Sequence, residues 1–132
     1  MVKWSDDYLI GVPEIDEQHK RLFEIAGRAY KVMQDEYSID KYDQIIEIIE
    51  ELKDYAVYHF KSEEEYLTKI QYKKFFSQKI AHDSFVEKIN NIDYEKIDEE
   101  QDKYLIEIMD FIVNWIVNHI IKLDKEIPNV PL

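Results

Sequence analysis

The sequence contains no cysteine, only two glycines (Gly11 and Gly27) and only three prolines. Without cysteine the chain can form neither a disulfide framework nor a thiolate metal site, and it has no cysteine nucleophile. Any bound metal ion must therefore take nitrogen and oxygen ligands. Proline is absent between residues 14 and 127. This absence, together with the shortage of glycine, favours long helices over a sheet with many turns.

An excess of positive charge is also lacking. The net charge is −12, and no basic stripe is present that could displace phosphate counterions, so no nucleic-acid partner is expected. The acidic residues concentrate in EIIEELKDY and IDYEKIDEEQDK, where they alternate with apolar residues as on the exposed face of a helix. The N-terminus, MVKWSDDYLIGV, has no apolar run after a basic segment, and no stretch reaches membrane-spanning length. We therefore expect a cytoplasmic protein without a membrane partner.

Helical periodicity is the main pattern that the sequence does contain. With 132 residues and 45% apolar content, the chain can bury one sizeable core, which predicts a single domain over residues 1–132. Apolar residues recur at steps of three and four in four seams. The seams cover residues 15–33, 45–66, 75–89 and 105–119.

Polar connections separate the four predicted helices. They are DEYSID, in which Ser38 and Asp40 are plausible N-caps, a tight link at residues 69–72, and the longer acidic stretch NNIDYEKIDEEQ. Short connections make successive helices antiparallel neighbours. The predicted fold is therefore all-α, an up-down-up-down four-helix bundle preceded by an extended N-terminal arm.

The protein has four histidines, and each lies in a different seam. They are His19, His59, His82 and His119. A lone histidine in an apolar seam is more often a hydrogen-bonded core residue than a metal ligand. Four buried imidazoles without a common partner would each need a separate hydrogen-bonding solution, whereas convergence on metal satisfies all of them together. The pattern therefore favours a metal site.

A carboxylate belongs to the same picture. Glu63 follows His59 by four residues, so both side chains project from one face of the second helix. Taken alone, Glu63 could equally be an exposed member of the acidic run 63–65. Imidazole and carboxylate ligands without sulfur suit iron, zinc, copper or manganese. Spacing leaves open whether the site holds two ions bridged by carboxylates or a single zinc.

Motifs in the same order along all four predicted helices resemble the hemerythrin family. They are Trp4, Tyr8 and Gly11 near the N-terminus, IDEQH at 15–19, HFKSEE at 59–64, Tyr72, His82 with Phe85, and WIVNHIIKLD at 115–124. The resemblance covers almost the whole chain. It implies two non-haem iron ions that are bridged by two carboxylates and by an oxo or hydroxo oxygen.

The resemblance also implies a role for individual residues. Glu63 and Asp124 would bridge the irons, and His19 and His59 would bind the iron that keeps an open position for dioxygen. The second iron would be bound by His82 and His119. The apolar wall of the oxygen pocket would comprise Leu22, Trp115 and Ile116, which can serve as core residues at the same time.

Two positions depart from the family pattern. Gln78, four residues before His82, stands where family members usually carry a further histidine ligand. Its amide oxygen could bind the second iron, it could leave a vacancy filled by water, or it could be a hydrogen-bonded packing residue. Lys73 replaces a proline that is common after the residue matching Tyr72, and we expect this change to be harmless.

Asp124 poses a geometric difficulty for its implied role as a bridge. Five residues of a regular α-helix turn through about 500°, so Asp124 would lie about 140° around the helix from His119. Either the helix widens locally, as in a π-bulge, or Asp124 belongs to a distorted last turn.

These features together predict reversible dioxygen binding by a carrier, store or sensor, which is a binding function and not an enzymatic one. A vacancy beside Gln78 would instead suit a diiron oxidase or a peroxide-consuming enzyme. An iron store or a structural metal bundle is the third alternative. Dioxygen is the expected partner, and the pattern leaves room for an unidentified redox or oxygen-accepting partner.

Overall fold

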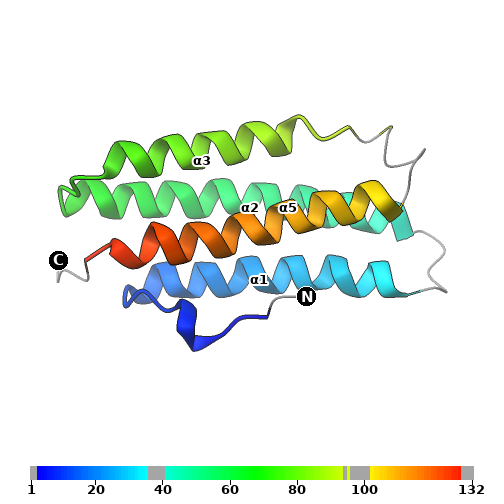
Figure 1. Cartoon of the computed structure of the whole chain (residues 1–132), viewed down its shortest axis with the longest axis horizontal. Helices are drawn as coiled ribbons and strands as arrows, with labels where there is room; N and C mark the ends of the chain where they lie inside the picture. The colour runs from blue at the N-terminus through cyan, green and yellow to red at the C-terminus, as the bar shows by residue number, and fades with distance from the viewer. Residues whose placement is uncertain (1–2, 36–40, 94, 96–101, 129–132) are drawn as a thin grey trace.

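The structure is a computed structural model that describes residues 3–35, 41–93, 95 and 102–128. Its long helices are α1 (Pro13–Gln34), α2 (Lys41–Lys69), α3 (Phe75–Asn90) and α5 (Asp102–Lys122), flanked by the short 3-10 turns η1 (Asp6–Tyr8) and η2 (Asp124–Glu126). The long helices lie side by side, and each runs antiparallel to the one before it (Figure 1). The described residues contain no strand. The predicted all-α, up-down-up-down bundle is therefore confirmed.

Two details of the predicted connections fall outside the described residues. These are the N-caps Ser38 and Asp40 and most of the acidic stretch between α3 and α5. The predicted helices themselves are present, and each extends beyond its seam by a few residues at one end or both.

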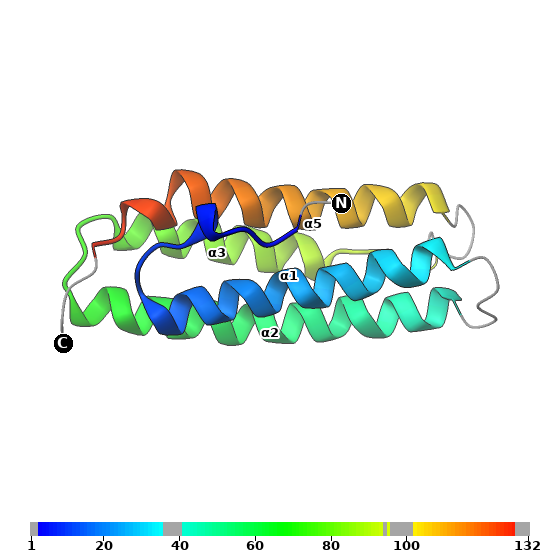
Figure 2. The same cartoon turned by 90° about the horizontal axis from the view of Figure 1, so that it is seen from below.

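The N-terminal arm is fastened to the start of α1. Pro13 is the first residue of α1, a position where its missing N–H costs nothing. One turn further on, the Asp16 carboxylate accepts hydrogen bonds from the backbone N–H groups of Ile10 (2.8 Å) and Gly11 (3.1 Å). Gly11 has φ 91°, a backbone conformation that suits glycine. The arm thereby turns back and lies across α1 and α5 (Figure 2).

The turn between α2 and α3 brings the second and third histidine helices together. Tyr72 N–H donates to Leu67 O (3.0 Å) and Gln71 N–H to Thr68 O (3.1 Å), the pair of bonds that defines a Schellman motif. Gln71 occupies the left-handed position with φ 54°, where a non-glycine residue costs about 1–2 kcal/mol. This tight reversal sets His59 on α2 opposite His82 on α3.

The bundle core is apolar along most of its length. Its fully buried large side chains include Ile25, Ile45, Ile49, Leu52, Phe85, Leu105, Met109 and Ile112. The buried polar side chains lie instead toward the end of the bundle that carries the α2–α3 turn and η2. Because the apolar part holds the four helices together, it fixes the spacing of the polar side chains at that end.

One expectation about membranes needs correction. The stretch Lys103–Glu126 has 24 residues and is long and apolar enough to cross a membrane by length and composition, whereas the sequence had predicted no such stretch. A helix in the core of a bundle passes the same test. Leu105, Met109 and Ile112 of this stretch are fully buried in the core, so its composition is explained by packing and is weak support for a membrane span.

Candidate metal centre

All seven side chains predicted as metal ligands come together at one end of the bundle. They are His19, His59, Glu63, Gln78, His82, His119 and Asp124, and none is more than 6% exposed. Each of the four long helices contributes to this cluster, and η2 supplies Asp124. Ionisable groups are seldom buried to this extent unless they are paired or bind a cation.

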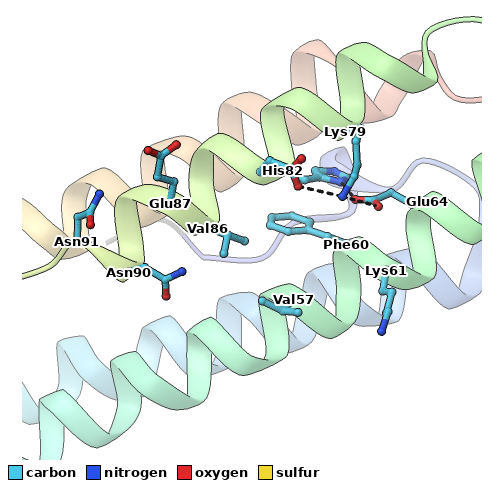
Figure 3. A pocket seen from close by; sticks show the side chains of 11 residues that line it. Val57, Phe60, Lys61, Glu64, Lys79, His82, Val86, Glu87, Asn90 and Asn91 are labelled. Atoms are coloured by element: carbon cyan, nitrogen blue, oxygen red, sulfur yellow. Dashed lines mark hydrogen bonds and ion pairs between the residues drawn. The ribbon is translucent and has the colours of Figure 1, made fainter.

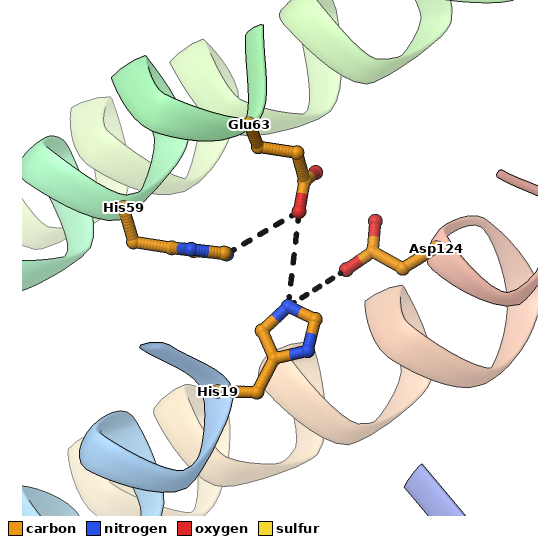
Figure 4. Close-up of side chains that lie close together, drawn as sticks. All are labelled: His19, His59, Glu63 and Asp124. Carbon is orange, nitrogen blue, oxygen red and sulfur yellow. Dashed lines mark ion pairs between the residues drawn. The ribbon is translucent and has the colours of Figure 1, made fainter. Parts of the chain in front are cut away.

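The ligand-type atoms fall into two groups. His19, His59, Glu63 and Asp124 offer atoms that all lie within 4.8 Å of one another (Figure 4), and Glu63, His82 and His119 do the same. We call these the His19–His59 side and the His82–His119 side of the cluster. Each side therefore has two imidazoles.

Glu63 belongs to both sides because its two oxygens point in different directions. Oε2 lies 3.4 Å from His59 Nε2 and 3.7 Å from His19 Nε2. Oε1 lies 3.1 Å from His82 Nε2 and 3.8 Å from His119 Nε2. This is the arrangement expected of a carboxylate that bridges two metal ions.

Asp124, which follows α5 near the C-terminus, also directs its two oxygens to different sides of the cluster. Its Oδ2 lies 3.2 Å from His19 Nε2, and its Oδ1 lies 3.2 Å from His119 Nε2. The α-helical bonds end with Leu123 N–H donating to His119 O, after which η2 begins at Asp124. The distorted last turn, and not a π-bulge, therefore removes the geometric difficulty posed by five-residue spacing.

Two further side chains orient the imidazoles, and sequence reasoning missed both. Gln18 Oε1 lies 2.7 Å from His59 Nδ1, and Glu64 Oε2 lies 2.8 Å from His82 Nδ1. With a metal ion on Nε2, the ring proton sits on Nδ1, which then donates to these oxygens. The only sequence signal was adjacency, because Gln18 precedes His19 and Glu64 follows Glu63.

Glu64 also connects the cluster to the surface. A groove of about 500 Å³ between α2 and α3 is lined by Phe60, Lys79 and His82 among other residues (Figure 3). Lys79 Nζ lies 3.4 Å from Glu64 Oε1 and 3.0 Å from Asp83 Oδ1. The Phe60 ring stacks on the His82 ring at 4.1 Å. On the groove side, His82 is therefore held by Glu64, which is paired with Lys79, and by the stacked ring of Phe60.

The electrostatics of the metal-free cluster follow from burial and from the two carboxylates. Burial lowers the pKa of His59 to about 3 and keeps this imidazole neutral. Burial alone would also lower the pKa of His19 and of His119, but Asp124 and Glu63 outweigh it and raise both to about 9. Burial opposes ionisation of Glu63, yet the imidazoles of His119, His19 and His82 hold its pKa well below the usual range. The Glu63 carboxylate is therefore charged and available to a cation.

The cluster fits a metal ion because it contains buried polar atoms that make no directed hydrogen bond. They include His19 Nε2, Glu63 Oε2 and Asp124 Oδ2, which face one another at ion-pair distances of 3.2–3.7 Å without hydrogen-bond geometry. A buried polar atom without a partner costs about 1–3 kcal/mol. Several such atoms of ligand type at one point are explained by a cation that binds them together. The donor set of nitrogen and oxygen without sulfur suits iron, zinc or manganese.

Gln78 lies in the cluster as predicted. Its contact with Asp124 is made by the amide nitrogen and not by the amide oxygen. Gln78 Nε2 donates to Asp124 Oδ1 at 3.0 Å, and Gln78 Oε1 has no partner. This contact holds Asp124 from the α3 side of the cluster.

A small cavity adjoins the His19–His59 side, and the three predicted pocket residues line it. Leu22, Trp115 and Ile116 border a volume of about 10 Å³, comparable to the smallest space that holds one water molecule. The remaining lining residues are His19, Ala56, His59, Phe60, Phe85, His119, Ile120 and Asp124. Trp115 also stacks on the His119 ring at 4.5 Å. The apolar members of this wall other than the predicted three were assigned no role from sequence.

Comparison with known proteins identifies the family. The sequence model of the Hemerythrin HHE cation binding domain matches residues 10–127. The chain belongs to the hemerythrin family. Bacteriohemerythrin from Clostridium acetobutylicum is 47% identical over 126 residues, which cover 96% of this chain and 98% of the relative. Bacteriohemerythrin from Pseudomonas aeruginosa is 29% identical over 89% of this chain and 72% of the relative.

Solved structures agree with this assignment. A crystal structure of wild-type hemerythrin superimposes with a TM-score of 0.74 at 27% identity, covering 96% of this chain and 94% of the other. The family is one that holds cations through histidine, glutamate and aspartate. Hemerythrins are oxygen-binding proteins and not enzymes, which agrees with the binding function predicted from sequence.

Proposed function

We propose that this hemerythrin-family protein binds dioxygen reversibly at two non-haem iron ions, bridged by Glu63, Asp124 and an oxo or hydroxo oxygen. The observation that carries the proposal is the placement of the two carboxylates. Each directs one oxygen to the His19–His59 side and the other to the His82–His119 side. One carboxylate shared in this way could be incidental to packing, whereas two that share the same pair of sides are the expected frame for a dinuclear centre.

Formal charge supports two ions in this frame. Two ferrous ions bring four positive charges, and two carboxylates with one hydroxide return three, so about one positive charge remains buried. Without cations, the negative charge of Glu63 faces the raised-pKa imidazoles of His19 and His119, which carry protons at neutral pH. Bound iron would supply the electrons that dioxygen takes up when it binds.

The surrounding residues support dioxygen as the ligand and the His19–His59 side as its position. The small cavity is bordered by both imidazoles of that side and, from the other side, by His119. The side chains of Leu22, Trp115 and Ile116 border it and keep bulk water away from the metal side that it adjoins. A carrier, a store and a sensor would all use the site in the same way.

An anaerobic reconstitution tests the proposal. The purified protein is loaded with ferrous iron, its iron and zinc are counted, and visible spectra are recorded as air is admitted and then removed. We expect about two irons per chain and a visible charge-transfer band that appears with air and disappears on deoxygenation. A band that never forms, or irreversible oxidation with steady oxygen consumption, would overturn reversible binding.

A further inference from the structure

Gln78 occupies a position in the cluster that its hydrogen bonds do not fully explain. Its side chain is 1% exposed and lies one helical turn before His82 on the inner face of α3. Nε2 donates to Asp124 Oδ1 at 3.0 Å, while the buried Oε1 has no partner. Rotating the amide by 180° would set two oxygens against each other, so the contact with Asp124 fixes which way the amide points. The unpaired oxygen therefore calls for a partner of its own.

Both carboxylates direct an oxygen to each side of the cluster, but on the His82–His119 side the atoms that all lie within 4.8 Å of one another include Glu63 and not Asp124, whose Oδ1 lies 3.2 Å from His119 Nε2. On the His19–His59 side the protein donors are two imidazoles and one oxygen from each carboxylate. On the His82–His119 side they are again two imidazoles and one oxygen from each carboxylate. A bridging oxygen adds one donor to each side. An ion with octahedral preference keeps one position for an external ligand in each case.

We propose that the His82–His119 side has its own binding position for a small anion or water, bordered by Gln78, in addition to the dioxygen position on the other side. The inference rests on the proposed diiron function. Gln78 is a positioning residue in this account, because its amide holds Asp124 and contacts the external ligand without binding iron itself. Oε1 accepts a hydrogen bond from bound water, and the second N–H of Nε2 is available to a bound anion.

Charge favours anions at both positions in the oxidised protein. Two ferric ions bring six positive charges, and two carboxylates with an oxo bridge return four, so about two positive charges remain in a buried site. Gln78 is neutral and adds no compensating charge. Two small monovalent anions would neutralise the cluster, whereas one would leave it charged.

The test counts azide ions bound by the reconstituted, fully oxidised protein, using a visible titration and calorimetry on the same samples. Iron is counted first. We expect the parent protein to bind about two azides per two irons, and Gln78→Leu, which removes both amide groups but leaves the position open, to bind about two as well. Gln78→His would add an imidazole donor and should reduce the number to about one. Ser77→His, on the exposed side of α3, is the matched control and should stay at about two.

Each outcome decides a separate claim. Two irons with one azide in the parent and two in Gln78→Leu would show that Oε1 binds iron, which overturns the inference. Two irons with one azide in every variant would also overturn it, because the second side would then be closed by something other than Gln78. Fewer than two irons in the parent would overturn the proposed function itself. If Gln78→His fails to fold, the parent and Gln78→Leu still decide the question.

Discussion

The His19–His59 side and the His82–His119 side share both carboxylates, yet their surroundings differ. On the first side, His59 is oriented by the buried amide of Gln18, and both imidazoles border the small cavity. On the second side, His82 is oriented by Glu64, which is 17% exposed and paired with Lys79. The ring of His82 is covered by the ring of Phe60.

The two sides of the cluster therefore differ in the residues that support their imidazoles. On the first side, the outer partner of His59 is the uncharged amide of Gln18, and the small cavity lies beside both imidazoles. The second side is braced by stacked rings and by an ion pair that reaches the α2–α3 groove. Under the proposed function, these unequal surroundings assign dioxygen to the His19–His59 side and assign the support of the shared carboxylates to the other side.

Glu63→Ala should have the largest effect, because it removes the ligand common to both sides. We expect loss of both irons and a fall in Tm of about 10 °C or more relative to the loaded parent, since metal binding contributes to folding stability. Glu65→Ala, two residues along α2 and exposed, should keep its iron. Iron counts and thermal unfolding measure both variants. A Glu63→Ala protein that retains two irons would show that the two sides do not depend on this carboxylate.

Filling the cavity should separate the two sides without dismantling the cluster. Leu22→Phe and Ile116→Trp add volume to a space of about 10 Å³, so dioxygen binding should slow by about tenfold or more while the iron count stays unchanged. Ile106→Trp, at a position 46% exposed on the same helix as Ile116, is the control. Stopped-flow mixing with oxygenated buffer gives the rates. Parent-like rates in both cavity variants would place dioxygen elsewhere.

Removing the partners of the imidazoles should have a smaller effect that differs between sides. Gln18→Leu deprives His59 of a buried acceptor, and we expect metal affinity to fall by about tenfold to a hundredfold. Glu64→Leu removes the acceptor of His82 in the same way, but Glu64 is 17% exposed, so water can replace it and the cost should be about threefold or less. Glu17→Leu, exposed and next to Gln18, serves as the control. Iron removal by a chelator is timed for each. Equal rates for Gln18→Leu and Glu64→Leu would contradict the difference between the two sides.

The smallest effect concerns protons. In the metal-free protein the pKa of His19 and of His119 is raised to about 9 from 6.5, so their contribution to stability is fully present below pH 6.5 and is lost as the pH rises through 9. The pKa of His59 is lowered from 6.5 to about 3, so this residue lowers the stability of the metal-free protein as the pH falls from 6.5 toward 3. Metal binding at pH 7 should therefore release about three protons per chain, two from the imidazoles of His19 and His119 and one from the water that becomes the bridging hydroxide, and calorimetry in buffers of different ionisation enthalpy measures them. Release of only about one proton would contradict protonated His19 and His119.

Local patterns account for most of the fold and of the cluster that sequence predicted. Step-three and step-four spacing places His59 and Glu63 on one face and assigns one histidine to each helix, because these relations hold within a single helix. Asp124 could not be placed by spacing, since its position depends on where α5 gives way to η2. Neither Gln18 nor Glu64 could be found, because their contacts cross between helices and depend on side-chain direction.

The tight link predicted at residues 69–72 is present, but its backbone conformation could not be predicted. The reversal after α2 places Gln71 in a left-handed conformation, where glycine would be the usual signal. Asp16 holds the N-terminal arm through hydrogen bonds from the backbone N–H groups of Ile10 and Gly11. From the sequence, an acidic residue in the first turn of α1 indicates only a favourable interaction with the helix dipole. Such contacts come from chain segments that meet only after folding.

The most direct test of two bridged irons is X-ray absorption at the iron edge on the anaerobically reconstituted protein. Shared carboxylates should hold the two ions about 3.5–4 Å apart, so the spectrum should contain an iron–iron contribution in this range, with only nitrogen and oxygen in the first shell. Glu63→Ala should lack that contribution. A parent protein loaded with iron whose spectrum shows isolated ions alone would contradict the bridging roles of Glu63 and Asp124.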